Sequence, residues 1–238
     1  SGVSGRVAGC VVGAQGVACV SDRSLIFTGW KAAYVAALPA GAIFQTRRIV
    51  KPQPRVSATG CPSWGEPGGP RIRMGPRSAS GGSDVSMTDL IARYCPYGQP
   101  GEDRLWFREA WILVGESGEV LEGQADLLRR DAVPMRIIYR ADGEVIMTDR
   151  FGWRAPIHMP RWSSRGAGEL LEVRVELASD ISEADALAEG CGSGEAFQDS
   201  QGFDRVRDRF RWGWTAMHGA DAWDAWCWAL MVRKGGAA

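Results

Sequence analysis

The sequence predicts one α+β domain in which a small mixed or antiparallel β-barrel carries helices at its edge. Short segments alternate apolar and polar residues with the period of a strand, and two later segments are helical by their caps or by their spacing. Few residues remain for the crossovers that parallel strands need. The 238 residues are 45% apolar and include eleven tryptophans, enough for a sizeable core.

The first elements of the domain are expected between residues 25 and 50. Residues 25–27 form a short strand candidate, and residues 31–38 read as a helix that ends near Gly41. A strand over residues 45–50 follows, and Pro52 stops it because proline cannot donate to a sheet. These elements are predicted to bring one helix next to a strand that is rich in polar side chains.

The second half of the chain adds further strands and two helices. The strands are predicted at residues 104–111, 136–139, 168–177 and 225–232. The first helix starts at Ser182, has Asp185 at the capping-box position and ends at Gly190. The second helix is amphipathic over residues 203–217, which predicts that one face packs on the sheet.

Three parts of the chain differ in composition. Residues 1–22 are rich in small residues without periodicity and are expected to be an extension, whereas residues 23–233 form the single domain. Residues 55–88, rich in Gly, Pro and Ser, are predicted to be a long insertion loop. Its arginines suit phosphate contacts or a solvated loop; they are Arg71, Arg73 and Arg77.

The charge distribution limits the classes of partner. The formal net charge is zero, which excludes a uniformly basic nucleic-acid-binding protein. Within the first 100 residues, however, eleven Lys and Arg face four Asp and Glu, so a local basic patch is possible.

Cysteine and histidine spacing argues against a metal site. The six cysteines form no Cys-x-x-Cys pair and the two histidines lie far apart, so we expect no zinc, no other metal, no cofactor and no disulfide framework. No apolar run approaches the twenty or so residues of a membrane span. A cytoplasmic protein without membrane contact is therefore expected.

Several polar residues stand out as candidates for binding or chemistry. Thr46, Arg47 and Arg48 lie together on a predicted strand, where a hydroxyl and two guanidiniums suit an anion or a nucleotide edge. Glu189 occupies the last turn of a helix, an unfavourable place for a carboxylate, which suggests a role beyond stability. His158, followed by Arg161, suits either a pocket mouth or a packed turn.

Four segments, in this order, resemble the phage and prophage ASCH-domain proteins over about residues 23–233. They are residues 45–54, residues 95–101 with 103–106, residues 157–162 and residues 180–190. The resemblance implies a PUA-like β-barrel, a fold associated with the binding of RNA and modified nucleosides. Some members of this superfamily are small amidohydrolases that remove the acetyl group from N4-acetylcytidine.

The resemblance also assigns roles to individual residues. In those hydrolases a Gly-x-Lys-Thr-x-Thr-x-Arg-like segment supplies a lysine and a threonine, and a later helix supplies a glutamate. Counted from Gly41, the threonine is Thr46, the arginine is Arg48 and the glutamate is Glu189. The lysine position is Ile43, which can neither accept a proton nor carry charge.

The sequence leaves three functions open. The first is a module that binds RNA or a nucleoside in a pocket lined by Thr46, Arg48 and Glu189, with phosphate contacts from Arg47. The second is an amidohydrolase that acts on N4-acetylcytidine-like nucleosides, with Lys31 as the candidate substitute for the missing lysine. The third is a diverged, non-catalytic interaction protein.

Overall fold

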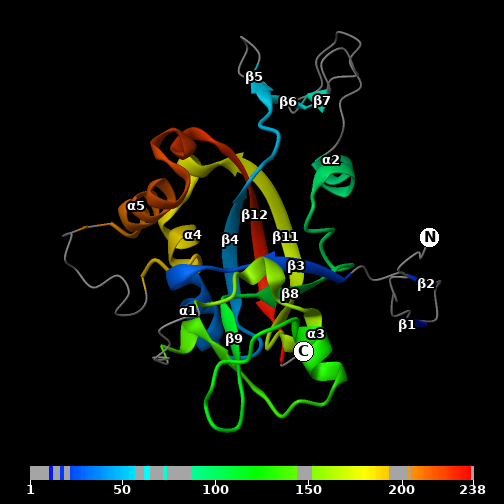
Figure 1. Cartoon of the computed structure of the whole chain (residues 1–238). Coiled ribbons are helices and arrows are strands. Elements are labelled where there is room, and N and C mark those ends of the chain that lie inside the picture. The colour runs from blue at the N-terminus through cyan, green and yellow to red at the C-terminus, as the bar shows by residue number, and fades with distance from the viewer. Residues whose placement is uncertain are drawn as a thin grey trace.

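The computed structural model describes residues 11–12, 17–18, 22–56, 62–64, 72–73, 87–143, 152–192, 203 and 205–236. These residues form a mixed α+β structure around one strongly curved sheet (Figure 1). The predicted extension over residues 1–22 and the loop over residues 55–88 lie largely outside the described part, as do the side chains of Arg71, Arg73 and Arg77.

The central sheet has five strands in the order β3-β8-β11-β12-β4. They span Asp22–Ile26 (β3), Arg104–Arg108 (β8), Ala167–Leu177 (β11), Trp226–Lys234 (β12) and Ile43–Ile49 (β4). β3 and β8 are parallel, whereas the other neighbours are antiparallel. β4 therefore forms one edge of the sheet and β3 the other.

Smaller sheets account for the remaining strands. β9 (Trp111–Val114) pairs with β10 (Arg136–Tyr139), and β1 (Val11–Val12) pairs with β2 (Val17–Ala18). A third small sheet comprises Arg55–Val56 (β5), Pro62–Trp64 (β6) and Ile72–Arg73 (β7). The single strand predicted over residues 104–111 is thus wrong: the chain leaves the central sheet at Glu109, whose buried carboxylate pairs with Arg165 at 2.8 Å.

Five α-helices are present in the described part of the chain. They are Gly29–Ala37 (α1), Met87–Tyr94 (α2), Ala125–Arg130 (α3), Glu183–Ala188 (α4) and Val206–His218 (α5). The predicted caps of α4 are confirmed: the Asp185 amide donates to the Ser182 hydroxyl at 3.0 Å, and Gly190 has a positive φ of 88°. α2 and α3 were not predicted, because short helices offer too few residues to show a period.

The hydrophobic core is divided between the two faces of the sheet at β4. On one face, Phe27, Phe44 and Phe107 pack edge-to-face with ring centroids 5.2–5.9 Å apart, under α1. On the other face, α4 and α5 pack through a cluster that includes Phe210 and Trp214. Because strand side chains alternate, Phe44, Thr46 and Arg48 belong to the first face, and Gln45, Arg47 and Ile49 to the second.

The two edges of the central sheet approach each other without joining. In the described residues no backbone pairing links β3 to β4, so the predicted barrel is not closed there. Side chains bridge the gap instead: Arg48 on β4 donates to the Ile26 carbonyl on β3 and stacks on Phe27 at 5.5 Å. The curvature of the sheet in Figure 1 agrees with this near approach.

Candidate functional site

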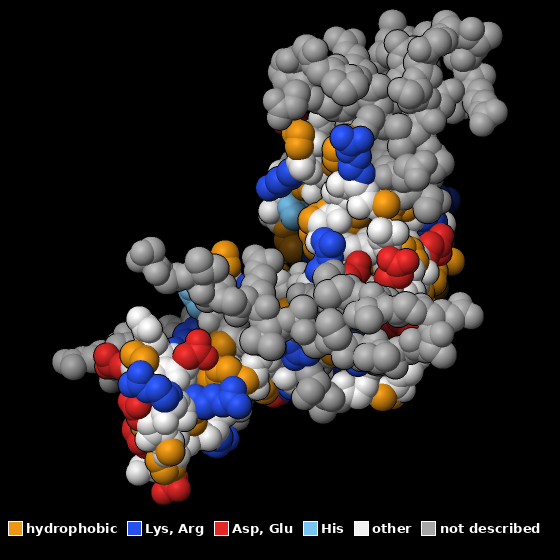
Figure 2. All heavy atoms as spheres, turned by 90° about the vertical axis from the view of Figure 1, so that its right-hand side faces the viewer, with side chains coloured by type: hydrophobic (Ala, Val, Ile, Leu, Met, Phe, Trp, Pro, Cys, Tyr) orange, Lys and Arg blue, Asp and Glu red, His pale blue; other side chains and the backbone are white. Residues whose placement is uncertain are grey.

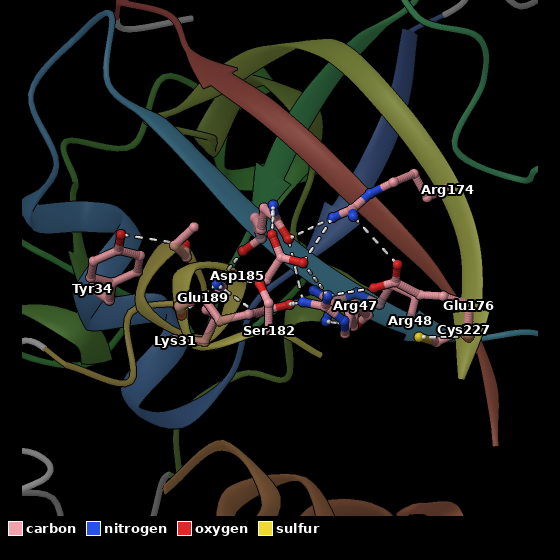
Figure 3. A network of polar contacts seen from close by, with 12 residues as sticks. Lys31, Tyr34, Arg47, Arg48, Arg174, Glu176, Ser182, Asp185, Glu189 and Cys227 are labelled. Carbon is pink, nitrogen blue, oxygen red and sulfur yellow. Dashed lines mark hydrogen bonds and ion pairs between the residues drawn. The ribbon is translucent and has the colours of Figure 1, made fainter. Parts of the chain in front are cut away.

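Lys31 reaches from α1 to the open edge of β4 and is almost completely buried, with 6% of its surface exposed. Its ammonium group donates to the Gln45 carbonyl, to the Glu189 carbonyl at 2.6 Å and to Glu189 Oε2 at 2.9 Å (Figure 3). All three ammonium protons therefore have acceptors. Lys31 links one helix to the edge strand and to the C-terminal end of α4.

The edge position of β4 explains why cations gather there. An edge strand has alternate carbonyl groups that no neighbouring strand can satisfy. Along β4 the Gln45 carbonyl accepts from Lys31, and the Arg47 carbonyl accepts from Arg48 at 3.1 Å. Side chains thus satisfy the strand that backbone pairing leaves open.

Glu189 lies at the C-cap of α4 and is 3% exposed. A carboxylate is disfavoured at this end of a helix, and burial adds to the cost. Two cations compensate: Oε2 accepts from Lys31 at 2.9 Å, and Oε1 accepts from Arg47 Nη1 at 3.3 Å. Each oxygen of the Glu189 carboxylate therefore binds a different cation, Lys31 from α1 and Arg47 from β4.

Arg47 lies inside the protein, under α4 and α5, with its guanidinium 5.7 Å from the Phe210 ring. It pairs with Glu176 of β11 and with Asp185 and Glu189 next to or within α4. Burial opposes its charge, but Glu189 and Glu176 raise the pKa of Arg47. The sequence suggested Arg47 as a phosphate ligand; in the folded chain it supports Glu189 from within.

The Lys31 amine is easier to deprotonate than an ordinary lysine. Burial lowers its pKa, the charge of Glu189 opposes this effect, and the nearby Arg48 adds to it. The rings of Trp30, Tyr34 and Phe44 surround the ammonium at 5.2–5.7 Å. A lysine with a lowered pKa is a suitable general base.

Two residues with nucleophilic side chains, Thr46 and Cys191, belong to the segments that Lys31 contacts or whose charge acts on it. Thr46, 1% exposed, follows Gln45 on β4, so its hydroxyl is one residue from the carbonyl that binds Lys31. Burial, reinforced by the charge of Glu189, raises the pKa of the Cys191 thiol to about 12. A thiol with this pKa stays protonated near neutral pH, which leaves Thr46 as the better candidate.

The predicted site residues fall into two groups. Glu189 contacts Lys31, the charge of Arg48 acts on Lys31, and Thr46 follows Gln45, whose carbonyl binds Lys31. Glu189 contacts Arg47 rather than Arg48. Ile43, the predicted lysine position, is 51% exposed on β4. The folded chain therefore brings a lysine to this region from α1 instead of from the strand.

His158 and Arg161 belong to a different surface, on two short turns. Exposed His158 lines a cleft of about 460 Å³ with Leu121 and Arg154. The Arg161 guanidinium lies 5.6 Å from the Trp106 ring, which Arg108 approaches at 4.3 Å. Two cations, Arg108 and Arg161, therefore lie near Trp106, whereas Arg154 lies 5.1 Å from the Trp111 ring.

A larger cavity of about 620 Å³ lies beside the N-terminal half of α1. Its walls include Phe27, Trp30, Trp153 and Arg140. Trp30 belongs both to this cavity and to the ring of aromatic groups around Lys31, at 5.7 Å. The cavity therefore adjoins the Lys31 cluster through one tryptophan.

Comparisons with known proteins give no match from which a role for this site could be inferred. The chain matches no protein-family model, no curated protein and no solved structure at a significant level. Among the residues that the structure describes, no His, Cys, Asp and Glu side chains are grouped so that they could hold a metal ion. The helices in these ranges are all too short or too polar to cross a membrane.

The supporting residues of the site were not identified from the sequence. Gln45, Glu176 and Arg174 join Asp185 in the network around Arg47. One signal was available: adjacent arginines on a strand face opposite sides, so one of the two must enter the packed interior and needs carboxylates there.

Proposed function

We propose that this chain is a PUA-like domain of the ASCH type that binds a modified nucleoside and hydrolyses an amide on it. Lys31 takes the role that the resemblance assigns to a lysine at position 43. The observation that carries the proposal is the buried hydrogen bond of 2.9 Å between Lys31 and Glu189. Lys31 also binds the carbonyl of Gln45, the residue before Thr46 on β4.

The chemistry follows from this geometry. Transfer of one proton from Lys31 Nζ to Glu189 leaves a neutral amine, which can accept the Thr46 proton as the hydroxyl attacks the amide carbonyl. The acyl group then forms an ester with Thr46, and the amine of the nucleoside leaves with the proton from Lys31. Water hydrolyses the ester, which releases the carboxylic acid and restores the threonine.

Two structural features support the fold and the ligand class of this proposal. Arg48 connects the two edges of the curved sheet, as expected for a small barrel that is nearly closed. The cavity of about 620 Å³ is large enough for a nucleoside, and its aromatic walls suit a planar base.

Hydrolysis is the direct test. Wild-type protein is expected to convert N4-acetylcytidine to cytidine and acetate, measured by chromatography. Lys31→Met should lower kcat/KM by about a thousandfold or more, because it removes the proton acceptor of a nucleophilic step. Thr46→Val should have a similar effect.

Ile43→Ala is the matched control on the same strand and should retain wild-type hydrolysis, because Ile43 is half exposed. Circular dichroism establishes that each variant is folded. Intact substrate after prolonged incubation with concentrated wild-type protein, or an unchanged rate in folded Lys31→Met, would refute the proposal.

A second candidate function, single-stranded RNA binding, is favoured by the Arg108, Arg161 and His158 surface. Cations beside an exposed turn suit phosphate contacts. The described side chains in Figure 2 mix Lys and Arg with Asp and Glu rather than forming one continuous basic patch. We therefore expect few phosphate contacts on an RNA strand.

Arg161→Ala is expected to weaken binding of a fluorescent oligonucleotide several-fold at low salt. Loss of one phosphate contact should also reduce the slope of log K against log salt by about 0.7. Arg130→Ala, at a site where the side chain is 70% exposed, is the control. Equal losses in both variants, or no binding by the wild type, would exclude this function.

A further inference from the structure

Arg47 is a buried cation that the proposed chemistry does not use. Its side chain has no exposed surface, and it comes from the same strand as Thr46 but from the opposite face. Its ionic partners are three carboxylates, Glu176, Asp185 and Glu189, on β11 and at the two ends of α4. Such a buried charge is retained at a high desolvation cost, so its effect on its neighbours needs an explanation.

The groups around Arg47 fix its orientation. Gln45 Oε1 accepts from Arg47 Nη1 at 3.3 Å, and Gln45 Nε2 donates to Asp185 Oδ1 at 2.6 Å. Arg174 donates to the same Asp185 at 3.1 Å and closes the network (Figure 3). With Phe210 of α5 over the guanidinium, Arg47 is held at Glu189 and has no path to a ligand.

The network balances three cations against three carboxylates. The cations are Lys31, Arg47 and Arg174, and the carboxylates are Glu176, Asp185 and Glu189. Glu189 is the member that joins Lys31 to the rest, since Lys31 binds Oε2 at 2.9 Å and Arg47 binds Oε1 at 3.3 Å.

We propose that Arg47 is a positioning residue that holds Glu189 in place. Because Arg47 pairs with the same carboxylate, the attraction between Glu189 and the Lys31 ammonium is weaker than it would be without Arg47. The catalytic consequence rests on the proposed function, because a lysine with a higher pKa is less often in the neutral form that accepts a proton. The contact itself does not depend on that function.

Other groups facing Lys31 set the background for this effect. They are Tyr34 and Trp30 on α1, Phe44 and Arg48 on β4, and Cys191 after α4. Burial lowers the pKa of Lys31, Glu189 raises it and Arg48 lowers it further. Removing Arg47 leaves these groups unchanged. It removes one positive charge near Lys31 and leaves Lys31 as the cation that pairs with Glu189. The pKa of Lys31 must then rise.

The experiment measures this pKa directly. Lys31, Lys51 and Lys234 are the three lysines of the sequence, so selective ¹³Cε labelling gives a simple NMR titration. Arg47→Met should raise the pKa of Lys31 by about one unit. Arg174→Met is the matched control: it removes a cation that binds Asp185 and Glu176, so it acts on Glu189 only through Arg47 and should raise the pKa of Lys31 clearly less than Arg47→Met does.

Glu176→Gln keeps the inference testable if Arg47→Met does not fold. It removes one of the carboxylates that pair with Arg47, so Arg47 interacts more strongly with Glu189. The attraction between Glu189 and Lys31 then weakens, and the pKa of Lys31 should fall. An unmoved Lys31 pKa in folded Arg47→Met, an equal shift in Arg174→Met, or no fall in Glu176→Gln would each overturn the proposal.

The titration needs no turnover, which separates the two proposals. Absence of hydrolysis by the wild type would refute the proposed function and leave the Arg47 result to stand or fall on the NMR data. If hydrolysis occurs, the lower limb of its pH profile should move upward in Arg47→Met by the same amount as the Lys31 pKa. Lys234, which caps the C-terminal end of α1, is the internal reference.

Discussion

Glu189→Ala is expected to lower the free energy of unfolding by about 3–5 kcal/mol, the usual effect of removing one partner from a buried ion pair. The substitution would leave the Lys31 ammonium and the Arg47 guanidinium buried without their shared carboxylate. Denaturant unfolding followed by tryptophan fluorescence and by circular dichroism measures the change.

An exposed ion pair provides the control for this expectation. Glu169 and Arg233 pair at 2.8 Å with about half of each side chain exposed, so Glu169→Ala should cost about 1 kcal/mol or less. The double variant Lys31→Met/Glu189→Leu should be more stable than Glu189→Ala, because one of the buried cations leaves with the carboxylate. A loss in Glu189→Ala no larger than that in Glu169→Ala would show that the buried network contributes little.

Phe107→Ala should also lower the free energy of unfolding by about 3–5 kcal/mol, because it opens a large cavity in the main core. The Phe107 ring lies 5.2 Å from Phe27 and 5.9 Å from Phe44. It also covers Gly166 and Gly168, where an added Cβ would lie within 3 Å of the ring. The ring therefore fills a space that β8 and β11 cannot close by themselves.

Ile157→Ala tests whether this effect is specific to the core. Ile157 is 63% exposed, so its truncation should change stability by about 0.5 kcal/mol or less. Denaturation midpoints and slopes of the two variants would be compared under the same conditions. Similar losses in both variants would contradict the assignment of Phe107 to the main core.

Elements with strong local signals were predictable from the sequence. α4 has its cap at Ser182 and its left-handed stop at Gly190, and both are present in the folded chain. The strand predicted over residues 168–177 corresponds to β11, and the amphipathic helix corresponds to α5 with its start moved to Val206. These features depend on residues that are close in sequence.

Features that depend on distant contacts were not predictable in this way. Nothing near Glu109 in sequence shows that the chain leaves the central sheet there, since its carboxylate is buried against Arg165, 56 residues away. The order of the predicted elements also indicated a barrel, whereas β3 and β4 remain edges joined by the Arg48 side chain. Closure depends on backbone register, which residue type specifies only weakly.

From the sequence alone it follows that Thr46, Arg47 and Arg48 share a strand and that Glu189 ends a helix. The folded chain alone shows that Arg47 enters the interior and that Lys31 of α1 meets Glu189, 158 positions away in sequence. Local hydrogen bonding and side-chain alternation set the first kind of feature. Contacts between distant residues depend on which elements pack together and exclude water, because a buried charge is stable only when an opposite charge or a hydrogen-bond partner is buried with it.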